Sequence, residues 1–263
     1  MSMPKPQDIK EYCGWLEISL GIKCDAVQRK HYEVVAKSLQ EQTENSAFWR
    51  TVKGQIGEFD SRYLKMTKHF LFMKSEVPEI HWKPHDSILD KSFRKNVIEN
   101  SRWPDPLEGG WITPRDWCSR VNDPIRTVMV VKYLDGVSFL VGELETLAQN
   151  HGLRVRSDFE AREEGYYAAH TYVTMQAEIP NIRWDTEKIE FDFEIQTTTQ
   201  FQEAIRPLTH PFYVARRSRT DPPETKWQWE FKTDEFRVNY LAHTLHHVEG
   251  LIVDVRDRET TGR

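Results

Sequence analysis

The stretch IEFDFEIQ, residues 189–196, alternates apolar and polar side chains without a break. A period of two predicts a β-strand with one buried face and one polar face. The polar face carries Glu190, Asp192, Glu194 and Gln196, and the apolar face carries Ile189, Phe191, Phe193 and Ile195. Carboxylates roughly 7 Å apart repel by about 2 kcal/mol at an effective dielectric of about 20, and by about 0.6 kcal/mol in bulk water. The acids therefore indicate a solvated outer face, unless one of them has a chemical role.

The segments around this strand predict an α+β fold, in which helices flank a mixed sheet. Further strands are predicted over 126–134, which is rich in β-branched residues, and over 170–179. A helix is predicted over 137–150, ended by Gly152, and Thr233 is predicted to cap a final helix. The apolar positions of that last helix recur every three or four residues: Phe236, Tyr240, Leu241, Leu245, Val248 and Ile252.

The first half of the chain is predicted to be mainly helical and then irregular. Helical spacing runs over residues 25–74, with Asp25 as the N-cap. Six prolines then fall within 78–124, a stretch interrupted by one short helix over 87–97 with Ser87 as its N-cap. We therefore expect one domain over 1–263, made of an N-terminal helical region (1–75), a catalytic core (76–217) and a C-terminal extension (218–263).

The composition bears on three classes of function: nucleic-acid binding, zinc or disulfide chemistry, and membrane association. The 263 residues include 41 acidic and 36 basic side chains, for a net charge of -5, so global attraction to nucleic acid is not expected, although a local basic patch could provide it. Three cysteines without a CxxC pair suggest neither a disulfide framework nor a zinc site. No run of 18 apolar residues and no signal peptide occurs, so we expect a cytoplasmic protein without a membrane partner.

A basic cluster surrounds the short helix predicted at 87–97. Lys83 precedes it, and Lys91 and Arg94 lie on one of its faces. Cations beside a helix N-terminus suit a polyphosphate, whereas the alternative is a solvated basic face. The sequence has neither a GxxxxGK[ST] loop nor a GxGxxG motif before a helix, so phosphate binding would depend on such side chains.

Two histidine-containing stretches have structural and functional interpretations. In REEGYYAAH, residues 162–170, an aromatic ring at the entry to a strand can stack on a base, or it can simply pack on the sheet edge. In HTLHH, residues 243–247, the spacing resembles a metal site on a helix. A packed helix with exposed imidazoles is the better interpretation there, because Glu249 is the one further ligand at suitable spacing.

Taken in order, four segments resemble the synthetase domain of the RelA/SpoT family, the pyrophosphokinases that make (p)ppGpp. They are KPHDSILDK (83–91), RVNDPIRTVMVVKYLDG (120–136), EEGYYAAH (163–170) and FEIQTTTQFQEAIRPLTH (193–210). The likeness runs from about residue 80 to 217, and residues 236–258 are similar to the C-terminal helix of single-domain small alarmone synthetases, including toxin-type members. The family's hydrolase domain and regulatory region have no counterpart here.

The resemblance implies a mixed sheet of the nucleotidyltransferase type and transfer of the β,γ-pyrophosphate of ATP to a ribose 3'-hydroxyl. It implies the following roles: Asp123 and Glu194 as catalytic residues and Mg2+ ligands; Lys83, Lys91, Arg94 and Arg126 as ATP-binding residues; and Tyr166, His170 and Gln196 as acceptor-binding residues. Tyr166 would stack on the acceptor base. Glu194 would also accept the proton of the acceptor hydroxyl, which requires hydrogen-bond reach.

Two departures from the family pattern bear on ATP binding. His81 stands where many members have the Arg of an R-x-K pair. Arg126 and Val128 replace the usual Gly-x-Arg, so one guanidinium has either moved to Arg126 or been lost. The second possibility favours a catalytically inactive nucleotide-binding module as an alternative function.

The identity of the acceptor stays open at this point. GDP or GTP as acceptor would make the product an alarmone, whereas toxin-type relatives modify the 3'-terminal adenosine of tRNA. A tRNA acceptor requires a basic track, because phosphate contacts dominate RNA affinity. Candidates for that track are Lys23, Arg29, Lys30 and the RRSR segment at 216–219. An antitoxin protein and a second copy of the chain are further candidate partners.

Overall fold

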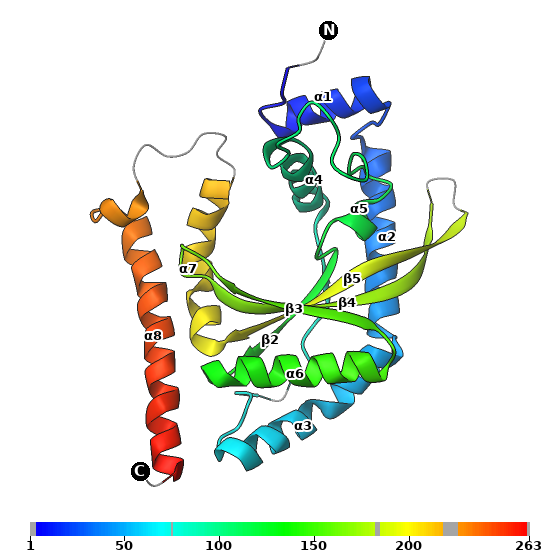
Figure 1. Ribbon diagram of the computed structural model, residues 1–263. Coiled ribbons are helices and arrows are strands. Elements are labelled where there is room, and N and C mark those ends of the chain that lie inside the picture. Colours follow the sequence, from blue (N-terminus) through cyan, green and yellow to red (C-terminus); the bar gives the residue numbers. More distant parts are fainter. Residues whose placement is uncertain (1–3, 75, 182–184, 218–225, 262–263) are drawn as a thin grey trace. The chain divides into compact units, whose positions relative to one another are not determined.

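The computed structural model describes residues 4–74, 76–181, 185–217 and 226–261 (Figure 1). The chain folds into two units, and each is assembled from three separate stretches. Unit 1 comprises Met1–Ser46, Ile80–Arg126 and Thr174–Glu194, and unit 2 comprises Ala47–Glu79, Thr127–Val173 and Ile195–Arg263. The expected organisation as one domain over 1–263 stays a prediction.

The described residues form both helices and strands, as expected for an α+β fold. The α-helices are α1 (Ile9–Leu20), α2 (Ala26–Glu44), α3 (Ala47–Thr67), α4 (His85–Phe93), α5 (Trp117–Arg120), α6 (Leu134–Asn150), α7 (Gln200–Arg217) and α8 (Asp234–Thr261). A π-helical turn, η1 (Arg94–Ile98), continues α4, and a 3-10 turn, η2 (Trp227–Trp229), precedes α8. Among these residues, no helix is both long and apolar enough to cross a membrane.

Five strands of the described chain form one mixed sheet. They are β1 (His81–Trp82), β2 (Ile125–Val131), β3 (Arg154–Ala161), β4 (Tyr167–Pro180) and β5 (Thr186–Thr199), and their order across the sheet is β1-β2-β5-β4-β3. The predicted strands at 126–134, 170–179 and 189–199 are confirmed as β2, β4 and β5. Phe191, Phe193 and Ile195 are at most 2% exposed, which confirms the buried face of β5.

Unit 1 is organised around α1 and α4, which pack against each other. Asp8 caps α1 by accepting the Glu11 N–H at 2.8 Å. Further along α1, the Tyr12 hydroxyl hydrogen-bonds Ser92 at 2.9 Å and accepts from Asn96 at 2.7 Å. These buried bonds fix the helix that carries Lys91.

Unit 2 contains two pairs of helices that lie side by side, α3 with α6 and α7 with α8 (Figure 1). One buried polar contact ties α8 to the start of α6: the Arg256 guanidinium binds both Asp135 oxygens, at 2.8 and 3.1 Å. It also donates to the Tyr63 hydroxyl of α3 at 2.8 Å. At the entry to α6, a Cβ on Gly136 would lie 2.9 Å from the end of the Leu71 side chain, so Leu71 packs closely against the start of that helix.

Two sequence predictions about helices are wrong in detail. The short helix begins at His85 with Pro84 as its N-cap, so Ser87 lies inside its first turn and is not the cap. Thr233 does cap the final helix, through a bond to the Phe236 N–H at 3.2 Å, and Asp25 caps α2 as expected. The apolar stripe of α8 is nevertheless not its buried face, because Tyr240, Leu241 and Val248 are exposed whereas Asn239, Ala242, Glu249 and Arg256 are buried.

Six elements were not predicted from the sequence: α1, α5, α7, β1, β3 and the turn η2. β3 is an edge strand whose side chains are mostly exposed, so it lacks the apolar alternation that marks a half-buried strand. α7 contains Pro207 and Pro211, which ordinarily indicate the end of a helix.

Candidate functional site

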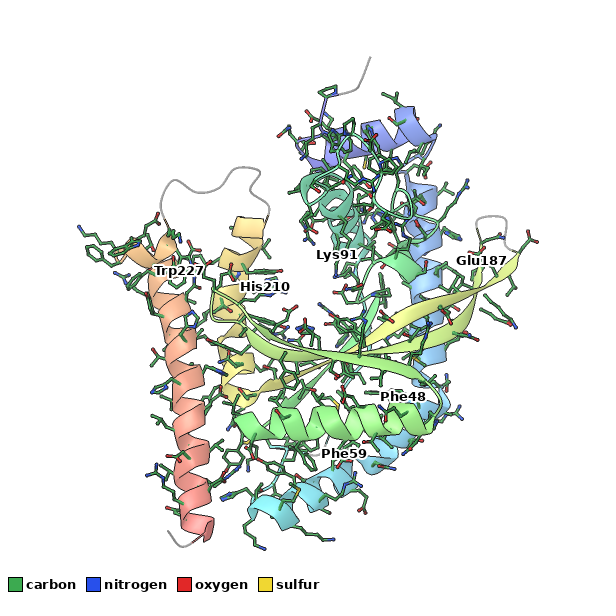
Figure 2. The ribbon with its side chains drawn as sticks, viewed as in Figure 1. Phe48, Phe59, Lys91, Glu187, His210 and Trp227 are labelled. Atoms are coloured by element: carbon green, nitrogen blue, oxygen red, sulfur yellow. The ribbon has the colours of Figure 1, made fainter. Side chains whose placement is uncertain are left out.

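Three charged side chains meet in unit 1. The carboxylate of Asp123 binds Lys83 Nζ at 2.8 Å through one oxygen and Lys91 Nζ at 2.7 Å through the other. Lys91 projects from α4, where Figure 2 labels it. Each of the three side chains is at most 20% exposed. We call these residues the Asp123 cluster, and the structure thus brings together three side chains that the sequence predicted to act together.

Backbone geometry places the cluster. β1 pairs antiparallel with β2, and beyond this pair the Lys83 N–H donates to the Pro124 carbonyl at 2.9 Å. Asp123 has a left-handed backbone with φ of 65°, a conformation that Asp tolerates better than most residues and that occurs often at functional sites. Lys91 also donates to the Asn122 carbonyl at 3.1 Å, which holds the turn before β2.

Burial and charge act against each other in the cluster. Burial alone would raise the pKa of Asp123, but Lys83 and Lys91 lower it below its ordinary value. Burial lowers the pKa of Lys83, although the Asp123 carboxylate opposes that change. The carboxylate is therefore ionised at neutral pH, and positive charge exceeds negative charge around it.

Lys95 adds to this excess of positive charge. Burial lowers the pKa of Lys95, and the repulsion from Lys91 lowers it further. The residue lies one helical turn beyond Lys91, close enough to interact electrostatically with Asp123. Lys95 was not among the residues predicted to bind ATP; its i, i+4 spacing from Lys91 is the sequence signal that could have pointed to it.

The two arginines predicted to bind ATP are placed differently. Arg94 is 8% exposed, and its guanidinium is held by Asp90 and Glu99, each at 3.1 Å. Arg126 lies directly opposite His81 in the β1–β2 pair. The strand pairing therefore puts two of the positions that depart from the family pattern, His81 and Arg126, side by side. The ATP-binding roles of Arg94 and Arg126 stay predictions.

The side chains on the polar face of β5 become more buried along the strand. Glu190 is exposed and Asp192 is half-buried, bonded to Thr174 at 3.0 Å, whereas Glu194 is 5% and Gln196 7% exposed. A purely solvated face would leave all four side chains in water. Burying a carboxylate is costly unless it is paired or hydrogen-bonded, so the burial of Glu194 favours a specific role for it.

A second group of predicted residues meets in unit 2. Gln196 donates to the Tyr166 hydroxyl at 2.7 Å, and the same hydroxyl lies 3.1 Å from His170 Nε2. The Arg162 guanidinium lies 5.2 Å from the centre of the Tyr166 ring, within cation–π range. We call Tyr166, His170 and Gln196 the Tyr166 cluster. Its groups are uncharged or weakly basic, and they combine an aromatic ring with amide and imidazole hydrogen-bonding groups.

The neighbouring Tyr167 packs against α8 instead. Its ring stacks on His246 at 3.6 Å, and its hydroxyl bonds His243 Nδ1 at 2.7 Å. The preceding Gly165 has φ of 82°, and a Cβ there would lie 2.6 Å from that of Ala242, so the turn must be glycine to meet α8. Of the two adjacent tyrosines, Tyr167 has the packing role. His243 and His246 pack against it as half-buried side chains and are not the exposed imidazoles expected from the sequence.

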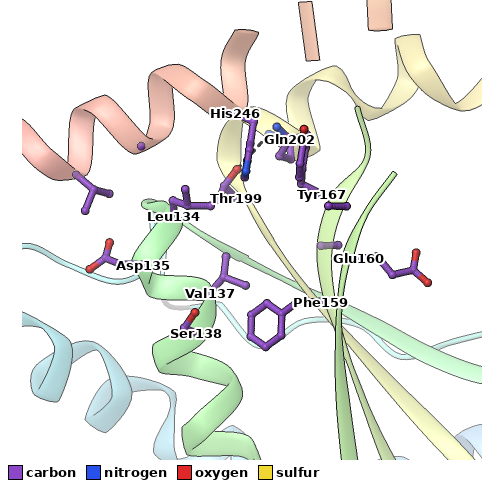
Figure 3. Close-up of a pocket in the computed structure, with 14 residues that line it drawn as sticks. Leu134, Asp135, Val137, Ser138, Phe159, Glu160, Tyr167, Thr199, Gln202 and His246 are labelled. Carbon is purple, nitrogen blue, oxygen red and sulfur yellow. Dashed lines mark hydrogen bonds between the residues drawn. The ribbon is translucent and has the colours of Figure 1, made fainter. Parts of the chain in front are cut away.

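Unit 2 also contains a cavity of about 400 Å3 (Figure 3). Its walls are mostly apolar and include Leu134, Val137, Phe159 and Val253, with Tyr167 and His246 at one side. The cavity is lined by Tyr167 but not by Tyr166. Unit 1 has a cavity of about 360 Å3 lined partly by Gln28 and Tyr32 of α2.

The residues that line the unit 1 cavity also position the Asp123 cluster. Tyr32 donates its hydroxyl proton to the Lys83 carbonyl at 2.6 Å, and Gln28 binds the buried His85 at 2.8 Å. Burial raises the pKa of Tyr32, so its hydroxyl is protonated and acts as a donor. Two residues that line this cavity therefore bond to the segment that carries Lys83.

The donor set for a metal ion consists of carboxylates. The described part of the chain has no group of three or more His, Cys, Asp or Glu side chains that could hold a metal. Mg2+ is commonly bound by one or two carboxylates together with substrate phosphates. Asp123, ionised, and Glu194, buried, match that chemistry, but both Asp123 oxygens are bound by ammonium groups.

The predicted basic track for RNA is largely neutralised where it can be described. Lys23 pairs with Glu17 at 4.0 Å, Lys30 pairs with Glu33 at 3.8 Å, and Arg29 pairs with Asp86. In the RRSR segment, positions 218 and 219 lie outside the described residues, as do the side chains at 216 and 217. The track therefore stays a prediction.

No family model and no curated protein matches this sequence. Solved structures do match its fold. Small alarmone synthetase 1 from Bacillus subtilis, bound to its product pppGpp, superposes with a TM-score of 0.52 and 16% identity over 88% of this chain and 97% of that chain. The same protein bound to AMPCPP gives a TM-score of 0.50 and 15% identity, over 89% and 98% of the two chains.

A GTP pyrophosphokinase family protein from Streptococcus pneumoniae gives a TM-score of 0.50 and 18% identity, over 87% of this chain and 92% of that chain. At such identities the likeness concerns the fold, and it extends over most of every chain compared. The α+β fold expected from the RelA/SpoT-like motifs is therefore confirmed: this chain has the fold of the small alarmone synthetases.

Proposed function

We propose that this protein is an ATP-dependent pyrophosphokinase that transfers the β,γ-pyrophosphate of ATP to the ribose 3'-hydroxyl of a guanosine nucleotide. The Asp123 cluster carries the proposal, because a buried, ionised carboxylate with an excess of ammonium groups suits a polyphosphate and its counter-ion. The fold supports it, since small alarmone synthetase 1 is seen with pppGpp and with AMPCPP.

On the donor side, Lys83, Lys91 and Lys95 would bind the triphosphate. Because both oxygens of Asp123 are bound to ammonium groups, we expect Lys83 and Lys91 to exchange Asp123 for phosphate oxygens when ATP binds. Asp123 and Glu194 would hold Mg2+, which when bound would neutralise charge on the phosphate oxygens. The lysines would stabilise the charge that develops on the transferred group.

On the acceptor side, the Tyr166 cluster would bind the guanosine nucleotide. The Tyr166 ring would stack on the base, and Gln196 and His170 hold its hydroxyl in place. Glu194 and Gln196 are two residues apart on β5 and therefore project from the same face of that strand. Glu194 would accept the proton of the 3'-hydroxyl as the new bond to phosphorus forms and AMP leaves.

The test is to incubate the protein with Mg2+ and γ-labelled ATP, with GDP, GTP or bulk tRNA in separate reactions. We expect label on a guanosine nucleotide together with release of AMP. Label on tRNA, lost when the 3'-terminal adenosine is trimmed, would instead support the second candidate acceptor and a toxin that blocks translation. ATP binding without transfer to any acceptor would favour the inactive binding module.

A further inference from the structure

The cavity of unit 2 is a different site from the Tyr166 cluster, although both belong to the same unit (Figure 3). The described residues that line it include Glu160 and Tyr167 but not Tyr166, His170 or Gln196. Its walls come from α6, β3, the start of β4, the junction of β5 with α7, and α8. The proposed reaction therefore gives this cavity no role.

A glycine of α8 leaves part of the cavity open. His246, Gly250 and Val253 share one face of the helix, because they follow one another at spacings of four and three residues, and all of them line the cavity. Among the described residues, a Cβ on Gly250 would have no packing neighbour within 4 Å. Glycine is a poorer helix former than every residue except proline. Helix stability and close packing would both favour a larger side chain at this position, so the open space requires another explanation.

Two side chains in the wall have buried nitrogen atoms that are available to a ligand. Gln202 is 6% exposed, and its Nε2 makes no hydrogen bond of normal geometry to the described residues. It lies close enough to Glu249, however, to oppose the effect of burial on the pKa of that carboxyl group. His246 Nδ1 is also buried without a hydrogen bond to the described residues, with a Glu249 oxygen 3.7 Å away. Buried polar atoms are usually paired, so both nitrogen atoms favour a ligand with a matching polar group.

The two nitrogen atoms differ in the partner that each one needs. The amide Nε2 of Gln202 is a hydrogen-bond donor. Burial and the neighbouring His243 lower the pKa of His246, so its imidazole is neutral at pH 7 and one of its nitrogen atoms is an acceptor. When Nε2 of that ring carries the proton, Nδ1 is the acceptor. A hydroxyl group can accept from Gln202 and donate to His246 at the same time.

The rest of the cavity suits an aromatic ring. Figure 3 shows Tyr167, His246 and Gln202 at one end of the cavity and Val137 and Phe159 at the other. The Tyr167 and His246 rings stack at 3.6 Å. Phe159 is 55% exposed, so a ring placed against it would remove apolar surface from water. Aromatic side chains at both ends therefore favour a ligand that is itself aromatic.

The charged groups in the cavity wall are already paired. Asp135 and Glu160 both line the cavity. Arg256 binds Asp135 at 2.8 Å, and Arg162 binds Glu160 at 2.5 Å. A charged ligand would lose its hydration without gaining an unpaired counter-charge from either carboxylate. The wall therefore favours an uncharged ligand.

We propose that the unit 2 cavity is a binding site for a small neutral aromatic alcohol. The ring packs against Phe159, and the hydroxyl group accepts a hydrogen bond from Gln202 Nε2 and donates one to His246 Nδ1. The volume of about 400 Å3 falls within the range of about 300–1,000 Å3 that is typical of small-molecule sites. The proposal concerns binding and does not depend on the proposed transferase activity.

The test is equilibrium dialysis of the purified full chain against thymol, in sealed cells, with the ligand measured by chromatography. Two compounds of similar shape are the comparisons: p-cymene lacks the hydroxyl group, and cumate carries a carboxylate in its place. We expect thymol to bind at a single saturable site, and p-cymene to bind about fivefold more weakly because it forms no hydrogen bonds. Cumate should show no saturable binding, because its charge would be buried without a partner.

Four variants locate the site. Gly250→Phe and Ser138→Phe place a ring in the cavity from α8 and from α6, so each should weaken thymol binding by at least about tenfold. Gly142→Phe is the matched control, since Gly142 is an exposed glycine of α6 with equally free space around its Cβ, and it should leave binding unchanged. Gln202→Leu should remove the preference for thymol over p-cymene.

Circular dichroism shows whether each variant is folded, and having two cavity-filling variants keeps the test decisive if one of them does not fold. The proposal is overturned if the unmodified chain shows no saturable thymol binding. It is also overturned if a folded Gly250→Phe or Ser138→Phe variant binds thymol at full strength, or if cumate binds as tightly as thymol.

Discussion

The Asp123 cluster and the Tyr166 cluster differ in the forces that organise them. The first is a set of full charges: two ammonium groups hold one carboxylate at 2.7 and 2.8 Å, largely away from solvent. The second is a set of hydrogen bonds around one aromatic hydroxyl, at 2.7 and 3.1 Å. Charge suits a polyphosphate, whereas a ring with directional polar groups suits a base. The difference therefore predicts large, charge-dependent effects in the first cluster and smaller effects in the second.

The largest effect is expected at Glu194, the acid on which the proposed chemistry depends. Glu194→Gln removes the group that accepts the hydroxyl proton and one oxygen ligand, so kcat should fall by about 100-fold or more. Glu190→Gln is the matched control, since it makes the same change at an exposed position of the same strand face. Equal loss in both variants, measured by AMP release, would show that Glu194 has no special role.

Asp123→Asn should cause a comparable loss of activity together with a loss of stability. The change leaves Lys83 and Lys91 as buried cations without their counter-charge, so the free energy of unfolding should fall by about 3 kcal/mol. The double variant Asp123→Asn with Lys83→Met should recover part of that stability but no activity. Urea unfolding and AMP release measure the two effects separately.

The stability lost in Asp123→Asn should also depend on pH in a defined direction. The folded-state pKa of Asp123 lies below its ordinary value of 3.8, so its contribution is present above that value and is lost as pH falls through the lower, folded-state pKa. The difference in the free energy of unfolding between the unmodified chain and Asp123→Asn should thus be constant near neutral pH and shrink below about pH 4. A difference that stays constant as the pH falls below about 4 would contradict the assignment.

An intermediate effect distinguishes Lys95 from Arg94. Lys95→Met removes one of the cations near Asp123 and should raise the KM for ATP by about tenfold. Arg94→Met breaks a buried contact with Asp90 and Glu99 and should mainly lower stability. The reverse outcome, with the KM for ATP raised by Arg94→Met alone, would support the role that the family resemblance assigned to Arg94.

The smallest effect is expected at the paired tyrosines. Tyr166→Phe removes the hydroxyl that Gln196 and His170 contact, and it should raise the KM for the acceptor by about fivefold, equivalent to about 1 kcal/mol. Tyr167→Phe loses its bond to His243 and should lower stability by a similar amount without changing that KM. If the two variants swap these effects, Tyr167 is the residue that binds the acceptor.

The sequence predicted the parts of the fold in which local pattern and burial agree. β5 is an example, since its alternation and its buried apolar face coincide. In α8 they do not coincide. The apolar period indicated one face, but the helix buries Glu249 and Arg256, and Arg256 has polar partners in Asp135 of α6 and Tyr63 of α3. Such specific partners cannot be inferred from hydrophobic spacing.

In the candidate sites, too, the sequence identified residues but not the contacts that they make. Motif positions identified Lys83, Lys91 and Asp123, and the structure brings them into contact. The placement of Arg94 and Lys95 depends on the local helix geometry, because α4 passes into a π-helical turn at Arg94. Choosing between Tyr166 and Tyr167 required knowing that α8 packs against the GYY turn.

The central claim, pyrophosphate transfer, is tested most directly by ATP labelled separately at the β- and γ-phosphorus, with Mg2+ and GDP or GTP as acceptor. The account predicts that both labels move together to the guanosine nucleotide and that the remaining adenosine nucleotide is unlabelled AMP. Transfer of the γ label alone, with the β label left in ADP, would contradict it and indicate an ordinary kinase.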